Sequence, residues 1–328
     1  MQETEKQLSN SYGFEIKMLY NYKNSFIAET GVGKKIIKKM SISPERVLFI
    51  HGAKEHLHQN NFTNIDRYIC TEEGMPYAII NGAFYTMTNL ISGRECNFDL
   101  REDVVEASKT LAKLHKASKG YIPPPGSAKR SELGKLPKYY KKRLDEIKRA
   151  KKIAQREKGT VDYLILKYID YFYEMGEDAL NRIYTSKYDM LVEKARNEKK
   201  FCHRDYSYCN IICDDDKMSV INFDYCSYEL KMYDIANFLR RKMRKCDWDV
   251  DEAKVIMDSY CSIEPISKDE FLILYLMLQF PHKFWRVINK YYNSKRTWRG
   301  KKFLKRCEEV IEEIKHHERF LKEFKLLF

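Results

Sequence analysis

The side chains best suited to chemistry lie in two short segments of the chain. His203, Asp205 and Asn210 have the spacing H-x-D-x-x-x-x-N, which is typical of the catalytic loop of phosphotransferases. In such a loop the aspartate accepts a proton from the attacking hydroxyl, and the asparagine holds a metal ion. We therefore predict Asp205 as the catalytic base and Asn210 as a Mg²⁺ ligand. The structural alternative is a capped loop with a buried aspartate.

The second segment is V-I-N-F-D over 220–224. Phosphotransferases place a strand here, and its I-D-F sequence supplies an aspartate that holds the nucleotide-bound Mg²⁺. This chain has Asn222 at that position, and a neutral ligand holds Mg²⁺ less well where phosphate charge must be offset. Asp224 lies on the same face as Asn222 if the strand stays extended, so it is predicted to substitute in part. Asn210, Asn222 and Asp224 are thus the candidate metal ligands.

A nucleotide also needs contacts from the start of the chain. Lys38 ends an apolar strand and is predicted to bind the α- and β-phosphates, with Glu55 on the next helix as its partner. The turn at 21–25, with Ser25, is predicted to cover the phosphates. It lacks the G-x-G-x-x-G loop of protein kinases, which favours a small-molecule kinase. ATP and Mg²⁺ are the expected cofactors. Three other lysines compete with Lys38: Lys34, Lys35 and Lys39.

Positioning these residues requires a particular order of elements. Alternation predicts three strands, and Ser43 then begins a helix as its cap, with Pro44 in the first turn. More strands, a hinge, helices and a catalytic hairpin follow. The expected strands are 14–20, 25–30, 34–38, 65–71, 77–80 and 83–88; the expected helices are 43–59, 100–116, 138–200 and most of the chain from 233; the hinge is 89–96 and the hairpin strands are 211–213 and 219–223.

These elements predict a two-lobed α+β fold of the protein-kinase type. Residues 1–90 form a small lobe with an antiparallel sheet and a helix. Residues 91–328 form a mainly helical lobe, which contains the hairpin segment 201–226 and a basic helical insertion over about 129–200. A chain of 328 residues is long enough for both lobes to bury a core.

Positive charge is concentrated in one part of the chain. The net charge is +13, and residues 129–158 carry thirteen Lys or Arg against four Asp or Glu. Such a run is either a solvated helix face or a surface for a polyanion or a phosphorylated substrate. No nucleic-acid recognition motif accompanies it, so specific nucleic-acid binding is not predicted.

The cysteines and the apolar segments indicate the compartment. Nine cysteines without a C-x-x-C pair argue against a zinc motif and a disulfide framework. Those near the catalytic segment are either reduced, buried thiols or groups for redox sensing and cross-linking in a later oxidising setting. The start of the chain lacks a secretory signal, and the apolar run 271–280 is too short to span a membrane. Synthesis in the cytosol and no membrane span are expected.

Several segments resemble the CotS family of bacterial spore coat proteins, kinase-like relatives of the aminoglycoside and choline phosphotransferases. They are G-R-E-C at 93–96, L-A-K-L-H-K-A-S at 111–118, the loop 203–210 and I-N-F-D-Y-C at 221–226. The resemblance implies synthesis in the mother-cell cytoplasm of a sporulating bacterium, deposition in the spore coat and other coat proteins as partners. Asn222 departs from the aspartate usual in this family.

Two functions follow from these observations. The first is a spore coat protein with a small-molecule-kinase-like fold, in which a degenerate phosphotransferase serves as a structural or interaction module; Asn222 and the absent glycine-rich loop favour it. The alternative is an active ATP- and Mg²⁺-dependent phosphotransferase acting on a small hydroxylated molecule or a coat component. Asp205, Asn210 and Lys38 favour that alternative. A polyanion-binding protein that uses 129–158 is a third interpretation.

Overall fold

The computed structural model describes residues 2–215, 217–293 and 301–327. The chain divides into two compact units. One comprises Met1–Ser131 and Glu198–Tyr228, and the other comprises Glu132–Asn197 and Glu229–Phe328. The predicted boundary after residue 90 falls inside the first unit, so the catalytic segment belongs to the same unit as the N-terminal sheet.

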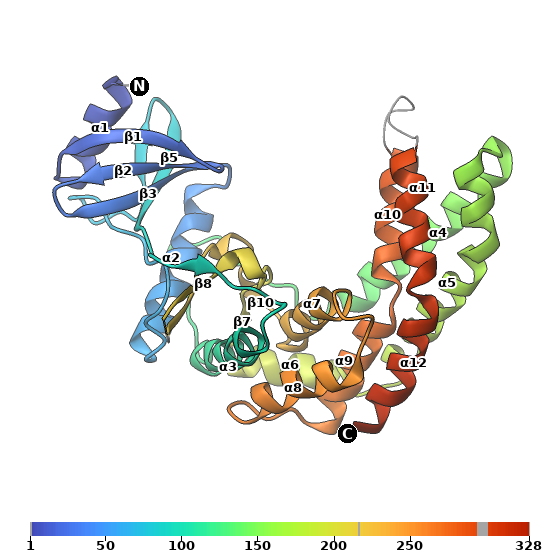
Figure 1. The fold of residues 1–328 in the computed structure, drawn as a ribbon. Coiled ribbons are helices and arrows are strands. Elements are labelled where there is room, and N and C mark those ends of the chain that lie inside the picture. Colours follow the sequence, from blue (N-terminus) through green and yellow to red (C-terminus); the bar gives the residue numbers. More distant parts are fainter. Residues whose placement is uncertain (1, 216, 294–300, 328) are drawn as a thin grey trace. The chain divides into compact units, whose positions relative to one another are not determined.

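The first unit is built around a five-stranded antiparallel sheet in the order β1-β2-β3-β5-β4. Figure 1 labels β1, β2, β3 and β5 of this sheet. Alternation along β3 places Ile37 and Lys38 on opposite faces. Ile37 packs in a core with Met87 of β5 and with Leu8 and Tyr12 of a helix that the sequence analysis missed. Lys38 therefore faces away from that core. The elements are α1 (Gln2–Tyr12), β1 (Ile16–Tyr22), β2 (Ser25–Thr30), β3 (Gly33–Met40), β4 (Ala78–Ile80) and β5 (Ala83–Asn89).

Two helices complete the frame of this unit. Helix α2 (Pro44–Gln59) begins as predicted: the Ser43 side chain accepts a hydrogen bond from the Arg46 amide, and Pro44 lies in the first turn. Helix α3 (Arg101–Ala117) has Glu102 and Asp103 in its first turn, where acidic groups favour the helix dipole.

The hairpin of the catalytic segment pairs with a strand from the predicted hinge to form a three-stranded sheet in the order β6-β8-β9. Its strands are β6 (Arg94–Glu95), β8 (Ile211–Asp214) and β9 (Lys217–Val220), and β7 (Phe201–Cys202) pairs with β10 (Ser227–Tyr228). Gly93 precedes β6 with a φ of +128°, and a Cβ there would lie 2.3 Å from the Cys213 carbonyl oxygen. Only glycine fits this conformation and close approach.

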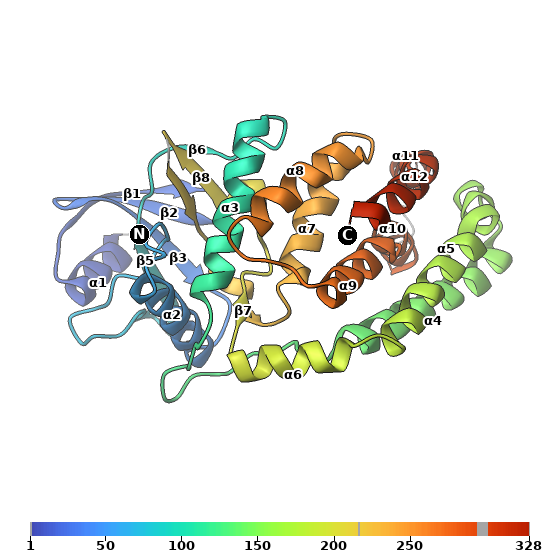
Figure 2. The same cartoon turned by 90° about the horizontal axis from the view of Figure 1, so that it is seen from below.

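The second unit is helical (Figure 2). Helices α4 and α5 lie side by side, and the apolar run 271–280 falls largely in α9 and is mostly buried. No helix among the described residues is long and apolar enough to cross a membrane. The helices are α4 (Leu136–Glu157), α5 (Thr160–Tyr184), α6 (Tyr188–Glu198), α7 (Met232–Met243), α8 (Val250–Cys261), α9 (Lys268–Gln279), α10 (His282–Asn293), α11 (Lys301–Glu312) and α12 (Ile314–Phe324).

Two predicted elements differ in the structure. The strand expected at 65–71 is absent; Ile65 and Tyr68 form only isolated bridges. The helix expected over 138–200 is divided into α4, α5 and α6, with breaks at 158–159 and 185–187. At the first break Lys158 adopts a left-handed conformation with a φ of 49°, and Gly159 then caps α5. Glycine at that cap and a left-handed residue before it end one helix and begin the next.

Candidate active site

A cavity of about 360 Å³ lies between the sheet and the catalytic hairpin, within the first unit. The side of β3 opposite the α1 core contributes Ile36 and Lys38, and the catalytic segment contributes Asn210, Asn222 and Asp224. Of the four candidate lysines on β3, Lys38 alone lines the cavity. Lys35 instead donates to the Val32 carbonyl and Asn89, while Lys34 pairs with Glu29, and Lys39 is exposed.

Hydrogen bonds join four of the predicted site residues in one chain. Lys38 Nζ donates to Asn222 Oδ1 at 3.0 Å, and Asn222 Nδ2 donates to Asn210 Oδ1 at 3.3 Å. Asn210 Nδ2 in turn donates to Asp205 Oδ2 at 2.9 Å. The structure therefore brings the candidate base, two candidate metal ligands and the candidate phosphate-binding lysine together.

Asp224 also lies beside Lys38, but the backbone that places it there is a turn and not the expected strand. Its carboxylate pairs with Lys38 Nζ at 2.5 Å. The expectation that Asn222 and Asp224 share a face of an extended strand is wrong, because β9 ends at Val220. Asn222 has a φ of 67° and begins a 3₁₀ turn over Phe223–Tyr225. Asparagine adopts this left-handed conformation more readily than most residues, which fits its place here.

The predicted pair between Lys38 and Glu55 is not formed. Glu55 lies outside the cavity and binds Arg67, whose Nε and Nη2 donate at 2.9 and 2.5 Å. One residue along α2 corresponds to a rotation of about 100°, so the neighbouring Lys54 is the residue that faces inward.

Lys54 and Asp66 form a buried pair that the sequence analysis missed. Lys54 is 1% exposed, and its Nζ lies 3.0 Å from Asp66 Oδ1 and 3.9 Å from the centre of the Tyr68 ring. Asp66 Oδ2 accepts the backbone N–H of Asn222 at 3.0 Å. The pair thus holds the left-handed residue in place. The available signal was a lysine within an apolar helical stripe that includes Ile50 and Leu57.

The turn that carries Ser25 lies at the cavity, and its predicted role of covering phosphates stays a prediction. Ser25 and Lys23 both line the cavity. Lys23 Nζ reaches Glu95 of β6 at 2.5 Å, and this hydrogen bond raises the pKa of the lysine. The turn is therefore tethered to β6, which lies within the predicted hinge at 89–96.

His203 anchors the loop that bears Asp205 by contacts with backbone atoms of Ile221 and Asp205. His203 is fully buried; its Nε2 lies 3.0 Å from the Ile221 carbonyl, and its Nδ1 accepts the Asp205 backbone N–H at 3.2 Å. These contacts fit a neutral imidazole with the proton on Nε2. Tyr206 adds a third anchor by donating to the Ala107 carbonyl of α3 at 2.7 Å. The loop is consequently fixed to both α3 and the hairpin.

The chain matches a family model described as "Spore coat putative kinase YutH" over residues 5–324. It is 27% identical over 278 residues to spore coat protein S of Bacillus subtilis (strain 168), which covers 84% of this chain and 79% of that protein.

Solved phosphotransferases share the fold. An aminoglycoside phosphotransferase from Alicyclobacillus acidocaldarius superposes with a TM-score of 0.87 at 20% identity, over 100% of this chain and 96% of that one. Amicoumacin kinase hAmiN, solved with AMP-PNP, Ca²⁺ and Ami, gives a TM-score of 0.59 at 11% identity, over 98% of this chain and 93% of that one. At these identities the likeness establishes the aminoglycoside phosphotransferase-like α+β fold.

Proposed function

The chain belongs to the family of kinase-like spore coat proteins described as YutH, and from this premise we propose that it is a coat protein whose cavity binds an adenine nucleotide. In this proposal the metal site is degenerate, and the protein serves in the coat as an interaction module. Its partners are other coat proteins, and it reaches the coat from the mother-cell cytoplasm.

The observation that carries nucleotide binding is the cavity itself. Its volume of about 360 Å³ is in the range of small-molecule sites. Apolar groups from Ile36, Leu90 and Ile221 line one part and suit a base, while Lys38 supplies a cation for phosphate oxygens. The four-residue hydrogen-bonded chain ends at Lys38, so its charged group is held among the residues that line the cavity.

The donor set fits the nucleotide better than it fits Mg²⁺. Asn210 and Asn222 offer only neutral oxygens, and Asn210 Oδ1 already accepts from Asn222 Nδ2. Asp224 is the one carboxylate among the three candidate ligands, and it is paired with Lys38. A bound Mg²⁺ would neutralise phosphate charge, but here it would have to displace these two contacts. This is why we propose a module and not an efficient kinase.

Thermal unfolding with ADP and ATP, each with and without Mg²⁺, tests the proposal. A nucleotide at 100 times its Kd stabilises the folded state by about 2.7 kcal/mol, which a melting curve resolves easily. Lys38→Ala should abolish the stabilisation. Lys39→Ala is the matched control, because Lys39 is the next residue of β3 and is exposed. No nucleotide-dependent shift in the wild type, or an equal shift in both variants, would contradict the proposed site.

An active phosphotransferase is the second candidate function, with a small hydroxylated molecule or a coat component as acceptor. The bond between Asn210 and Asp205 Oδ2 favours it, because it holds the carboxylate beside a potential metal ligand as the reaction requires. Asp205 would accept the hydroxyl proton, and Lys38 would offset charge on the phosphates. Release of ADP in the presence of candidate acceptors distinguishes this function from the first.

A further inference from the structure

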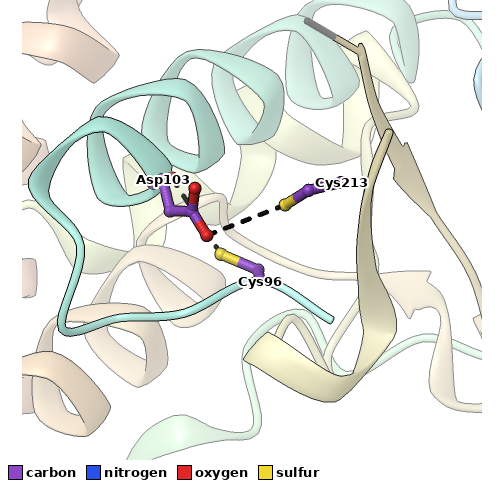
Figure 3. Close-up of side chains that lie close together, drawn as sticks. All are labelled: Cys96, Asp103 and Cys213. Carbon is purple, nitrogen blue, oxygen red and sulfur yellow. Dashed lines mark hydrogen bonds between the residues drawn. The ribbon is translucent and has the colours of Figure 1, made fainter. Parts of the chain in front are cut away.

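A second cluster of reactive side chains lies on the far side of β8 from the nucleotide cavity. Cys96 follows β6, Asp103 lies in the first turn of α3, and Cys213 is on β8 (Figure 3). All three are buried, and one ligand atom from each lies within 4.8 Å of the other two. Cys213 Sγ is 3.9 Å from Asp103 Oδ2, and Cys96 Sγ is 4.0 Å from the Asp103 carbonyl oxygen.

We propose that Cys96, Cys213 and Asp103 bind a zinc ion through two thiolates and one carboxylate. Zn²⁺ is typically tetrahedral, with Zn–S bonds of about 2.3 Å and Zn–O bonds of about 2.0–2.2 Å, so two of its ligand atoms lie roughly 3.6–3.8 Å apart. The 3.9 Å separation of Cys213 Sγ and Asp103 Oδ2 is close to that value. The ion would take the place of the two thiol protons and leave one coordination position for water.

Contacts around Asp103 prepare its carboxylate for this role. Arg94 Nη1 and Nη2 donate to Oδ2 and Oδ1 at 2.5 and 2.8 Å, and the Asn97 backbone N–H donates to Oδ2 at 2.7 Å. Hydrogen bonds of this kind orient metal-binding carboxylates. Oδ2 already accepts two of them, so zinc at Oδ2 would displace the Asn97 bond, whereas Oδ1 accepts one and keeps a lone pair for a metal. The charges also balance, since two thiolates and a carboxylate carry three negative charges, and Zn²⁺ with the Arg94 guanidinium carries three positive ones.

Strand register favours a metal over a disulfide. Arg94 pairs with Cys213, and the Cys96 backbone N–H donates to the Ile211 carbonyl at 2.9 Å, so the two cysteines are diagonal neighbours across the strand pair. Diagonal neighbours are typically 7–8 Å apart at the backbone, whereas a disulfide requires Cα atoms within about 7 Å. A metal ion between the sulfurs spans the larger gap.

Zinc at this position would join the end of β6 and the first turn of α3 to β8, and β8 borders the nucleotide cavity. β8 follows Asn210 directly, and its Ile212 lines the cavity. Gly93 also packs against the Cys213 carbonyl, so the chain within the predicted hinge is already held close to β8. The ion would therefore stabilise the catalytic hairpin. It is separate from any metal bound with nucleotide, and the inference does not depend on nucleotide binding.

Cobalt titration of the reduced, chelator-treated protein tests the proposal, because Co²⁺ replaces Zn²⁺ and its bonds to thiolates give charge-transfer absorption. We expect such absorption in the wild type and its loss when Zn²⁺ is added. Cys96→Ser and Cys213→Ser should each weaken binding by at least about 100-fold, since even residues that only support a ligand contribute 10- to 100-fold. Cys70→Ser is the matched control, because Cys70 is an exposed cysteine of the same unit.

Three results would overturn the inference. One is the absence of thiolate absorption in the wild type, and another is equal cobalt binding by wild type and both serine variants. The third is a mass lower by two hydrogen atoms without reductant, with Cys96 and Cys213 in one cross-linked peptide. If the serine variants do not fold, thiol labelling of the wild type in a urea series decides: Zn²⁺ should raise the urea concentration at which the buried Cys96 and Cys213 react with a maleimide, and an unchanged concentration would contradict the site.

Discussion

Asn222 has a donor at one end of its side-chain amide and an acceptor at the other, and the candidate site uses both. The oxygen accepts from Lys38, and the nitrogen donates to Asn210 Oδ1. An aspartate could not make the second bond, because two oxygens would face each other without a proton. At the scale of one residue, asparagine therefore stabilises the site without a metal, whereas aspartate would stabilise it with one.

Asn222→Asp should consequently have opposite effects without and with Mg²⁺. Without the ion we expect a loss of about 1 kcal/mol in the free energy of unfolding, the usual value of one hydrogen bond. With Mg²⁺ the added carboxylate should tighten ATP binding in calorimetry, because an anionic oxygen is the preferred ligand. If Asp224 already serves as the ligand, Asn222→Asp helps little, and Asp224→Asn abolishes the Mg²⁺ dependence. Unchanged titrations in both variants would exclude a Mg²⁺ role for this pair.

Asp205 carries the corresponding prediction for catalysis. Should the wild type transfer phosphate or hydrolyse ATP, Asp205→Asn should reduce the rate by roughly 10²–10⁴, the usual contribution of a positioned base. Nucleotide binding should persist, because Asp205 is not among the residues that line the cavity. Steady-state ADP release and a melting curve on the same sample measure the two effects. Full activity in the variant would remove Asp205 from the mechanism.

The elements were predictable where periodicity and capping agree. Ser43 and Pro44 fixed the start of α2, and β3 emerged from its alternating pattern. The pairing of Glu55 was not predictable, because a one-residue change in the orientation of a helix exchanges an exposed position for a buried one. The turn at Asn222 was not predicted for a related reason. Its left-handed conformation is stabilised by Asp66, which is distant in sequence. Non-local contacts of this kind have no local signature.

Helix α2 offers a matched comparison between its buried and exposed ion pairs. Lys54→Met should lower the free energy of unfolding by about 3 kcal/mol, because it leaves Asp66 without its partner. This value is at the low end for buried pairs, since Asp66 keeps 15% of its side-chain exposure. Glu55→Ala breaks a pair in which Arg67 is 43% exposed, so a change below about 1 kcal/mol is expected. Urea unfolding of both variants measures the difference.

Equal losses for the two variants would mean that the Lys54 pair does not support the hairpin. A loss in Lys54→Met accompanied by weaker nucleotide binding would instead link α2 to the cavity, which Lys54 and Asp66 both line and where Asp66 binds the Asn222 backbone. Glu55→Ala should leave nucleotide binding unchanged, because Glu55 lies outside the cavity.

At the scale of the whole molecule, the net charge of +13 has a clear focus in the second unit. The basic segment forms α4, and Lys141, Lys142 and Arg149 are exposed there. Arg143 is not part of this surface: its guanidinium lies 4.4 Å from the Trp285 ring and donates to His282 at 3.1 Å. The concentration of basic residues is visible in the sequence, but which of them are exposed and which are packed is known only from the fold.

The salt concentration needed for elution from heparin distinguishes the two interpretations of this surface, an anion-binding face and a solvated helix face. If α4 binds an anionic coat partner, Lys141→Gln, Lys142→Gln and Arg149→Gln together should lower the ionic strength at which the protein leaves a heparin column, because each lost cation removes a screened attraction. The matched control replaces three exposed lysines of the first unit, Lys17, Lys34 and Lys39, with glutamine. A selective effect of the α4 variant supports an anion-binding face. Equal shifts in both triple variants would mean that net charge alone governs retention and that α4 is a solvated face.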